Sequence, residues 1–441
     1  MKRFVTLFIS LMLLISCLSG ISASAISFDC DVETHSDSIL MVNLDSDMVV
    51  FEKDADTKRY PASLTKIMTY IIANEYFDDY DNTRIEIKQA VITNLEANGI
   101  ACSGLEWHVG KSLTVTDLLY ALMVPVGHDA AAVFDDYITK DSGTSFVELM
   151  NKKAQELGCT STHFVNPTGV HNPDHYTTAR DMYLITKYAM GLPMFSKICS
   201  TSTYYLEGDE YPIITTNYMI DSGRGGDYFY TYATGVKNGT TDEAGRCLVS
   251  TAVYDGYAYM VVCLHAPYNF ERDITEQYPM IESANLYRWA FLNLEFVTQV
   301  TKDTPICEQE VEHAWDTKST LLVPESDLNI ILPDDYNDAD VVITPDTTEP
   351  VSAPIKKGEV ITTATVYYKG DEITKINLVA QEDIRVSFIL YVSELVKSVL
   401  TSVWFLISVL IVVVLFVVYV GVSSSYSKKK REQKSSKNRR R

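Results

Sequence analysis

An uncharged aliphatic run near the C-terminus, VWFLISVLIVVVLFVVYVGV, constrains this chain more than any other feature. It covers residues 403–422, and a helix of that length spans about 30 Å, the thickness of a bilayer's hydrocarbon core. The tail after it, residues 423–441, carries nine basic side chains and one acidic side chain. Because basic residues beside a membrane helix stay in the cytoplasm, we expect a single-pass protein of the cell membrane. Its C-terminus would be cytoplasmic and its main body extracytoplasmic. A buried helix of a soluble protein would not explain the basic tail.

The N-terminus has the three parts of a secretory signal peptide. A basic pair at residues 2–3 precedes an apolar stretch at residues 4–15, and Ala-Ser-Ala at residues 23–25 suits the cleavage site. We therefore expect residues 1–25 to be removed. A loose lipoprotein cleavage box around Cys17 leaves open whether that cysteine is lipidated instead.

The charge of the chain lies mostly between these two segments. Residues 1–25 carry +2 and residues 423–441 carry +8, so the total of −21 leaves −31 on residues 26–422. A body this acidic repels nucleic acid and anionic lipid, and no basic stripe offsets it. The sequence therefore excludes nucleic acid as a partner.

Two hairpin signals enclose a block of helices. The first hairpin turns at Asp45-Ser46-Asp47, and the second turns at Asp255-Gly256 between two apolar strands. Residues 114–117 read as a capping box at a helix start, and residues 83–116 read otherwise as short strands and loops. The expected helices are 61–77, one after residue 117, 143–158, 177–191 and 281–293. This order predicts an α+β fold, with helices on one antiparallel sheet.

Composition changes after residue 299, which suggests a second domain. Short alternating runs with Pro and Asp breaks, such as TATVYYKG, predict a small all-β domain. The domains expected are a signal peptide at 1–25, a larger α+β domain at 26–299, a β-rich domain at 300–385, a linker at 386–402, a transmembrane helix at 403–422 and a basic tail at 423–441.

The stretch PASLTKIMTY contains a serine and a lysine in helical register. Pro61 suits a helix start, and Ser63 and Lys66 lie three residues apart, so they face the same side. A serine hydroxyl needs a base to act as a nucleophile, and a lysine with a lowered pKa can supply it. Such a pair alone is common on ordinary helix surfaces, so its meaning depends on further motifs.

Three further blocks follow in order: LLYALMVPVGHDAAAVF, STHFVNPTGVHNPDHYTTARDM and GVKNGTTDEAGRCLVSTA. Together with PASLTKIMT they resemble the serine D-Ala-D-Ala carboxypeptidases, the low-molecular-weight penicillin-binding proteins of the peptidase S11 type. The resemblance runs from about residue 35 to residue 385. It implies the transpeptidase fold shared by penicillin-binding proteins and β-lactamases.

The resemblance also implies a mechanism. Ser63 would attack the carbonyl between two terminal D-alanines of a peptidoglycan stem peptide, and Lys66 would take its proton. The N–H groups of Ser63 and Thr240 would form the oxyanion hole, and Lys237 would position the terminal carboxylate. The substrate-binding strand would consist of Lys237, Asn238, Gly239, Thr240 and Thr241. β-Lactam antibiotics would acylate the same serine, and no cofactor or metal is expected.

The second and third motifs depart from this family. Where the family has S-x-N, this chain has Val126-Gly127-His128, and where it has K-T-G, this chain has Lys237-Asn238-Gly239. Val126 has no hydroxyl to bridge the lysines or relay a proton to the leaving amine. His128 could replace part of the asparagine's role, since histidine ordinarily titrates near neutral pH, or could be a hydrogen-bonded residue at a helix start. Asn238 could still donate to a carboxylate.

Three other interpretations remain. A catalytically impaired protein that binds cell-wall peptides as a scaffold or regulator is favoured by Val126. The intact Ser63, Lys66 and Lys237 oppose it. A β-lactamase would need a glutamate-activated water, for which no motif is found. His163, His171 and His175 could suggest a metal, but Pro173 within the segment disfavours the helix that such ligand spacing would need.

Overall fold

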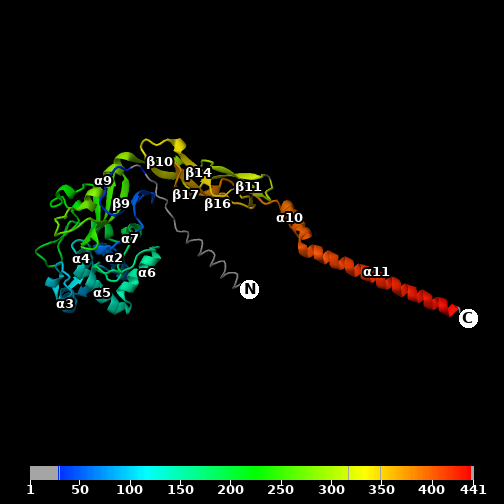
Figure 1. The fold of residues 1–441 in the computed structure, drawn as a ribbon, viewed down its shortest axis with the longest axis horizontal. Coiled ribbons are helices and arrows are strands. Elements are labelled where there is room, and N and C mark those ends of the chain that lie inside the picture. Colours follow the sequence, from blue (N-terminus) through cyan, green and yellow to red (C-terminus); the bar gives the residue numbers. More distant parts are fainter. Residues whose placement is uncertain (1–27, 29, 316, 348, 439–441) are drawn as a thin grey trace. The chain divides into compact units, whose positions relative to one another are not determined.

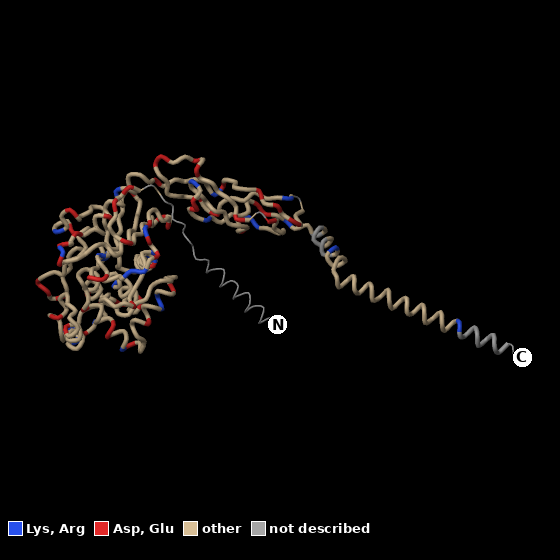
Figure 2. The backbone as a smooth tube through the Cα atoms, in the orientation of Figure 1, with Lys and Arg blue, Asp and Glu red and all other residues tan. Residues whose placement is uncertain are grey.

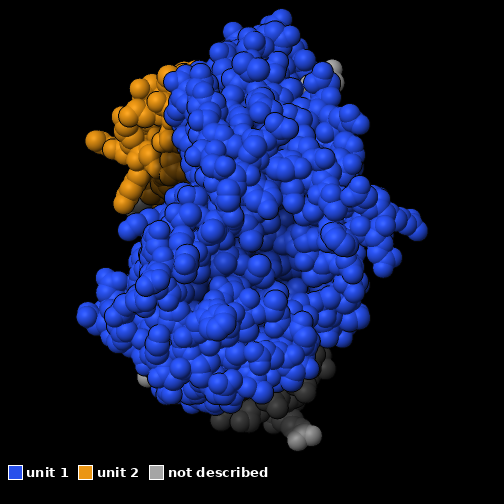
Figure 3. All heavy atoms as spheres, turned by 90° about the vertical axis from the view of Figure 1, so that its left-hand side faces the viewer, with its two compact units in different colours: residues 1–299, 329–342, 366–374 blue, residues 300–328, 343–365, 375–441 orange. Residues whose placement is uncertain are grey.

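The computed structural model describes residue 28 and residues 30–315, 317–347 and 349–438. The predicted signal peptide lies outside the described residues. The described chain forms two compact units, coloured separately in Figure 3. Figure 2 marks the positions of acidic residues along the backbone, and they occur throughout the described chain up to the C-terminal helices. Unit 1 runs to residue 299 and adds 329–342 and 366–374, and unit 2 consists of 300–328, 343–365 and the residues from 375 on.

A five-stranded antiparallel sheet forms the centre of unit 1 (Figure 1). The predicted hairpin at Asp255-Gly256 is present, and it joins the two longest strands of the sheet. In spatial order the strands are β2 (Val49–Lys53), β1 (Ser38–Asn43), β9 (Tyr257–Ala266), β8 (Gly245–Tyr254) and β7 (Ala233–Thr241). The strand β7, which carries the third motif, therefore lies at an edge where a peptide could pair with it.

The strand β9 is buried continuously from Tyr259 to Leu264, which indicates that both faces of the sheet are covered. Helix α9 (Tyr278–Asn293) packs on β8 and β9, while α7 (Ala179–Met190) packs on β1 and β9. The expected α+β class is thus confirmed.

The helix α2 (Thr65–Tyr76) is the core of the helical block, and it is buried from Thr65 to Asn74. It packs against helices α4, α5, α6 and α7, so its first turn is held on several sides. The remaining helices are α3 (Gln89–Ala97), α4 (Val115–Met123), α5 (His128–Ser142), α6 (Phe146–Glu156) and α8 (Phe195–Cys199). Short 3₁₀ turns are η1 (Ala62–Leu64), η2 (Leu105–His108), η3 (Tyr218–Ile220) and η4 (Gly226–Tyr228).

Residues 83–116 differ from the prediction of strands and loops alone. The strands β3 (Arg84–Glu86) and β4 (Ser112–Thr114) do pair, but the helix α3 lies between them. Only Ile92 and Leu95 of α3 are buried, so its apolar stripe is too narrow to indicate a helix from the sequence. A further two-stranded ribbon joins β5 (Thr203–Tyr204) and β6 (Ile213–Ile214).

The C-terminal part is all-β up to residue 380, as expected, and its first strand begins at Leu294. Two sheets are present among the described residues of this part. One has the order β14 (Val341–Pro345), β16 (Val360–Tyr368), β17 (Asp371–Ala380), β12 (Ser319–Pro324), β11 (Cys307–Glu312) and β15 (Val351–Ser352). The other joins β10 (Leu294–Val300) and β13 (Leu328–Pro333), and a 3₁₀ turn, η5, covers Asp338–Asp340.

Two helices end the described chain. The expected linker forms α10 (Phe388–Thr401), and α11 (Val403–Asn438) contains the aliphatic run. Within α11, Val403–Lys428 is long and apolar enough to cross a membrane by length and composition, and its most apolar window is not buried. A core helix of a soluble protein would be buried, so the exposure agrees with a membrane helix.

Candidate active site

Ser63 lies on the 3₁₀ turn η1, directly before the buried helix α2. Two glycines press against this turn. A Cβ on Gly239 would lie 2.6 Å from Ser63 N, and a Cβ on Gly169 would lie 2.0 Å from Ala62 O. Ala62 itself has a positive φ of 48°, which is uncommon for a residue with a side chain. The turn that carries Ser63 is therefore held between β7 and the loop that contains Gly169.

Lys66 lies within reach of Ser63, as the three-residue spacing predicts. Its Nζ is 3.0 Å from Ser63 Oγ and donates to Thr168 O at 2.5 Å. The side chain is fully buried. Burial lowers the pKa of Lys66 well below its usual value, the charge of Lys237 lowers it further, and Asp129 opposes them. The lowered pKa favours the neutral amine, which is the form that a general base requires.

The edge strand β7 brings the third motif to the same place. Lys237 is 2% exposed, and its Nζ donates to Pro125 O at 2.6 Å. Burial lowers its pKa to about 8, so Lys237 is mostly protonated at neutral pH. Asn238 Oδ1 accepts a hydrogen bond from Thr216 Oγ1 at 2.6 Å.

The remaining strand residues have backbone and turn contacts. Thr240 pairs with Arg246 across to β8, and Thr241 Oγ1 accepts the N–H of Ala244 at 3.0 Å. The Thr241 hydroxyl thus supports the turn that ends β7, while Gly239 permits the close approach to Ser63.

The second motif lies between α4 and α5. Val126 is 42% exposed. Gly127 has a φ of +70°, and a Cβ there would lie 2.2 Å from Leu122 O, so only glycine fits. His128 begins α5, and its Nδ1 is buried without a hydrogen-bond partner among the described residues.

The titration of His128 differs from the expectation for a free imidazole. Burial lowers its pKa to about 3, and the positive charges of Lys66 and Lys237 contribute, while a hydrogen bond with the backbone of Ala101 raises it. The ring is therefore neutral at physiological pH. A relay that depends on His128 titrating near pH 7 does not fit this environment, although a neutral ring can still donate or accept one hydrogen bond.

A buried carboxylate supports the start of α5. Asp129 Oδ2 accepts the N–H groups of Ser103 at 2.6 Å and Leu105 at 3.1 Å, and burial raises its pKa. One oxygen of Asp129, one of Glu106 and the Cys102 sulfur lie within 4.8 Å of one another. The backbone donors already satisfy Asp129, so this group reads as a clamp on the loop rather than a metal centre.

The three histidines considered for a metal have other partners or positions. His163 Nδ1 is 2.6 Å from Asp174 O, and His171 packs edge-on against Tyr60. His175 Nε2 is 2.9 Å from Thr65 Oγ1, which donates to Ala62 O at 2.8 Å. His175 therefore supports the turn that carries Ser63.

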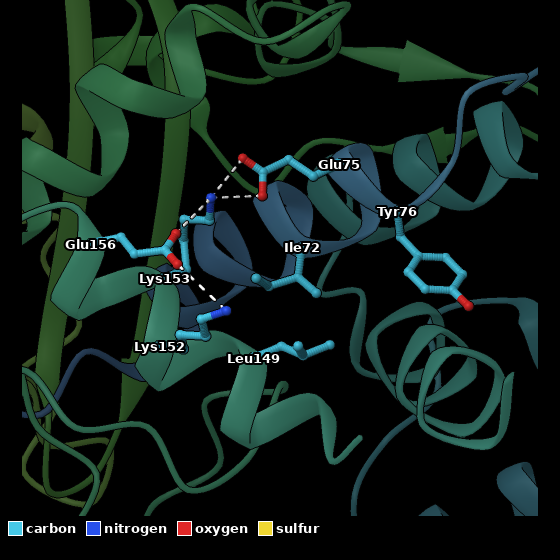
Figure 4. Close-up of a pocket in the computed structure, with 7 residues that line it drawn as sticks. All are labelled: Ile72, Glu75, Tyr76, Leu149, Lys152, Lys153 and Glu156. Atoms are coloured by element: carbon cyan, nitrogen blue, oxygen red, sulfur yellow. Dashed lines mark hydrogen bonds and ion pairs between the residues drawn. The ribbon is translucent and has the colours of Figure 1, made fainter. Parts of the chain in front are cut away.

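A surface hollow between α2 and α6, shown in Figure 4, lies apart from these residues. Its charged groups are paired, since Lys153 binds Glu75 at 2.8 Å and Lys152 lies 3.8 Å from Glu156. None of the candidate catalytic residues lines it, so it is not the reactive site.

The structure thus joins Ser63 to Lys66 directly and packs Gly239 against Ser63. Both lysines act on the electrostatics of His128. Sequence reasoning missed the carbonyl groups of Thr168 and Pro125, which accept hydrogen bonds from the two lysines. It also missed Thr216, which donates to Asn238. A carbonyl group is common to every residue, so no side-chain signal could have identified these acceptors.

Comparison with known proteins gives two consecutive family matches. Residues 23–268 match the D-alanyl-D-alanine carboxypeptidase family, and residues 296–386 match the C-terminal domain of penicillin-binding protein 5. The D-alanyl-D-alanine carboxypeptidase DacF of Bacillus subtilis is 27% identical over 391 residues, which is 87% of this chain and 95% of that protein. The D-alanyl-D-alanine carboxypeptidase DacC of Escherichia coli is 28% identical over 360 residues, which is 78% of this chain and 83% of that protein.

The fold agrees with these matches. The crystal structure of penicillin-binding protein 5 from Haemophilus influenzae superposes with a TM-score of 0.65 at 24% identity, and the match covers 81% of this chain and all of that one. The expected transpeptidase fold is confirmed.

Proposed function

The chain belongs to the D-alanyl-D-alanine carboxypeptidase family, and on that premise we propose that it removes the terminal D-alanine of peptidoglycan stem peptides through an acyl-serine. The contact of 3.0 Å between Lys66 Nζ and Ser63 Oγ carries the proposal. Burial lowers the pKa of Lys66, so the contact joins a nucleophile to a base rather than to a charged surface lysine.

In the first step, Ser63 Oγ forms a bond to the carbonyl carbon of the scissile D-Ala–D-Ala bond while Lys66 Nζ takes its proton. The N–H groups of Ser63 and Thr240 stabilise the oxyanion, for which backbone donors are suited. Lys237 and Asn238 bind the terminal carboxylate.

The proton then passes to the leaving amine as the C–N bond breaks. Val126 offers no hydroxyl, and the neutral His128 holds no surplus proton because its pKa is lowered to about 3. We assign the return of the proton to Lys66, which received it. Water then attacks the acyl carbon while Lys66 takes its proton, the bond between that carbon and Ser63 Oγ breaks, and Lys66 returns the proton to Ser63 Oγ.

The second candidate, a scaffold that binds cell-wall peptides without turnover, rests on Val126 alone. The Ser63–Lys66 contact and the buried, bonded Lys237 oppose it, because a binding protein needs neither a lowered lysine pKa nor a positioned serine.

The domain and membrane assignments are also proposals. Catalysis would reside in residues 26–299, next to a β-rich domain at 300–385 and a linker at 386–402. Residues 403–422 would anchor the protein with the basic tail 423–441 in the cytoplasm, and the exposed aliphatic helix and basic tail support this. Protease digestion of intact cells should then remove the catalytic domain. If the domain is instead protected from the protease, the proposed orientation is wrong.

Covalent labelling tests the proposed function. Full-length protein in detergent is exposed to a fluorescent penicillin, and release of D-Ala from a stem-peptide mimic is measured in parallel. We expect wild-type and Ser142→Ala, an exposed serine at the end of α5, to be labelled and active. Ser63→Ala should lose both signals. Labelling without D-Ala release would support the scaffold candidate, and labelling of Ser63→Ala would refute the assignment of the nucleophile.

A further inference from the structure

Three segments converge beside the second motif. Pro125 O accepts from Lys237 Nζ at 2.6 Å, and the preceding carbonyl, Val124 O, accepts the N–H of Thr216 at 3.3 Å. The Thr216 hydroxyl in turn donates to Asn238 Oδ1 at 2.6 Å. Thr216 therefore connects the end of α4 to the side chain of the third motif.

The segment that carries Thr216 is fixed by its own contacts. Thr215 is 5% exposed, its N–H donates to Ser202 O at 2.8 Å, and its carbonyl accepts from Arg224 Nη2 at 2.7 Å. The N–H of Asn217 donates to Thr215 Oγ1 at 3.1 Å. A hydroxyl held on such a segment can fix the orientation of a neighbouring side chain.

The contact has a chemical consequence for Asn238. An amide side chain has one accepting end and one donating end. Because Thr216 occupies the oxygen, the Nδ2 group is directed away from Thr216, and it has no protein acceptor among the described residues. Asn238 is only partly buried, so this N–H₂ group remains open to solvent and to a ligand.

An open N–H₂ group beside Lys237 suits a carboxylate. With the amide reversed, Asn238 would present its oxygen to the anion and repel it. Hydrogen bonds to a charged acceptor are stronger than hydrogen bonds between neutral groups. Hydrogen bonds that follow one another in a chain, donor to acceptor, also polarise and strengthen one another.

We infer that Thr216 is a positioning residue: its hydroxyl holds Asn238 with the amide N–H₂ toward the substrate and so selects peptides that end in a free carboxylate. This inference rests on the proposed function, because it concerns the same substrate-binding strand. It assigns a recognition role to a threonine 22 positions before Asn238, outside the motifs of the sequence.

The test compares two ligands that differ only at the C-terminus: a stem-peptide mimic ending in D-Ala-D-Ala and the same peptide as a carboxamide. Dissociation constants are measured by ligand-observed NMR on full-length Ser63→Ala protein in detergent, where no turnover occurs. Thr216→Val is the test variant and Thr216→Ser is the conservative one. Thr298→Val is the matched control, because Thr298 Oγ1 donates to Asn329 Oδ1 at 2.8 Å on β10.

We expect Thr216→Val to weaken the carboxylate peptide about tenfold, the effect of one lost hydrogen bond to a charged group. The carboxamide should be unaffected, Thr216→Ser should restore binding, and Thr298→Val should change neither ligand. In the active protein, the same variant should raise KM for the carboxylate peptide more than it lowers kcat. Equal weakening of both peptides, no change, or a parent protein that binds both peptides equally would overturn the inference. A protein that selects the carboxylate but releases no D-Ala would refute the proposed function while leaving this inference intact.

Discussion

The substitution Gly169→Ala should slow acylation of Ser63 by more than its effect on the free energy of unfolding can explain. Gly169 has a φ of +80°, and an added Cβ would lie 2.0 Å from Ala62 O and 3.0 Å from Thr65 Oγ1. Ala62 directly precedes Ser63, so the methyl group must displace the turn that carries Ser63, the proposed nucleophile. The contact is with backbone, which cannot rotate away as the end of a flexible side chain can.

The expected cost has two parts. A residue with a Cβ loses roughly 1–2 kcal/mol in the left-handed conformation, and overpacking a rigid site costs about 1–3 kcal/mol. Gly158 provides the matched control, because its φ is +81° and a Cβ there meets nothing within 4 Å. Gly158→Ala should therefore lower the free energy of unfolding by the first part alone, and Gly169→Ala by both, or about 2–5 kcal/mol.

Two measurements on the full-length protein in detergent decide the outcome. Urea unfolding gives the free energy, and the rate of labelling by fluorescent penicillin, corrected for the folded fraction, gives the effect on acylation. We expect Gly158→Ala to be labelled at the wild-type rate. Gly169→Ala should be labelled at least about tenfold more slowly, which needs only ~1.4 kcal/mol of the strain to reach the transition state. Labelling of Gly169→Ala at the wild-type rate would refute the role of Gly169 in holding the turn.

Two further predictions concern the proton. Val126→Ser together with His128→Asn should raise D-Ala release, within the range of about 10²–10⁴ that general acid–base assistance supplies; unchanged release would show that the proton has another path. Penicillin labelling should fall with decreasing pH as Lys66 becomes protonated. Lys237→Met removes a charge that lowers the pKa of Lys66, so it should move this acid limb to higher pH, while Lys237→Arg should leave it in place. An identical profile for both variants would contradict the electrostatic coupling of the lysines.

The elements that sequence predicted well have local signals. The Asp255-Gly256 turn joins β8 to β9 as expected, and the predicted capping box is present, with Asp117 N donating to Thr114 Oγ1 at 3.0 Å. Each signal lies within four residues, so it does not depend on tertiary packing. The helix α3 has no such signal, because only two of its residues face the core.

The site was predictable only as far as side chains define it. Spacing placed Ser63 and Lys66 together, and the structure confirms their contact. Thr216 could not be identified, because its partner Asn238 lies on another element and no periodicity links them. The pKa of His128 also depends on burial and on two lysines distant in sequence, which composition does not reveal.

The backbone carbonyls explain which part of the missing serine's role this site retains. Thr168 O accepts from Lys66, and Pro125 O accepts from Lys237, so both buried lysines keep a hydrogen-bond partner although Val126 has no hydroxyl. A carbonyl oxygen accepts hydrogen bonds but has no proton to give. It can therefore hold the lysines in place, but it cannot pass a proton to the leaving group. A strained β-lactam ring makes a smaller demand on that proton than a peptide amine does. Val126→Ser should consequently raise D-Ala release by a larger factor than it raises penicillin labelling, and equal factors would place the serine's missing role in the attack of Ser63 instead.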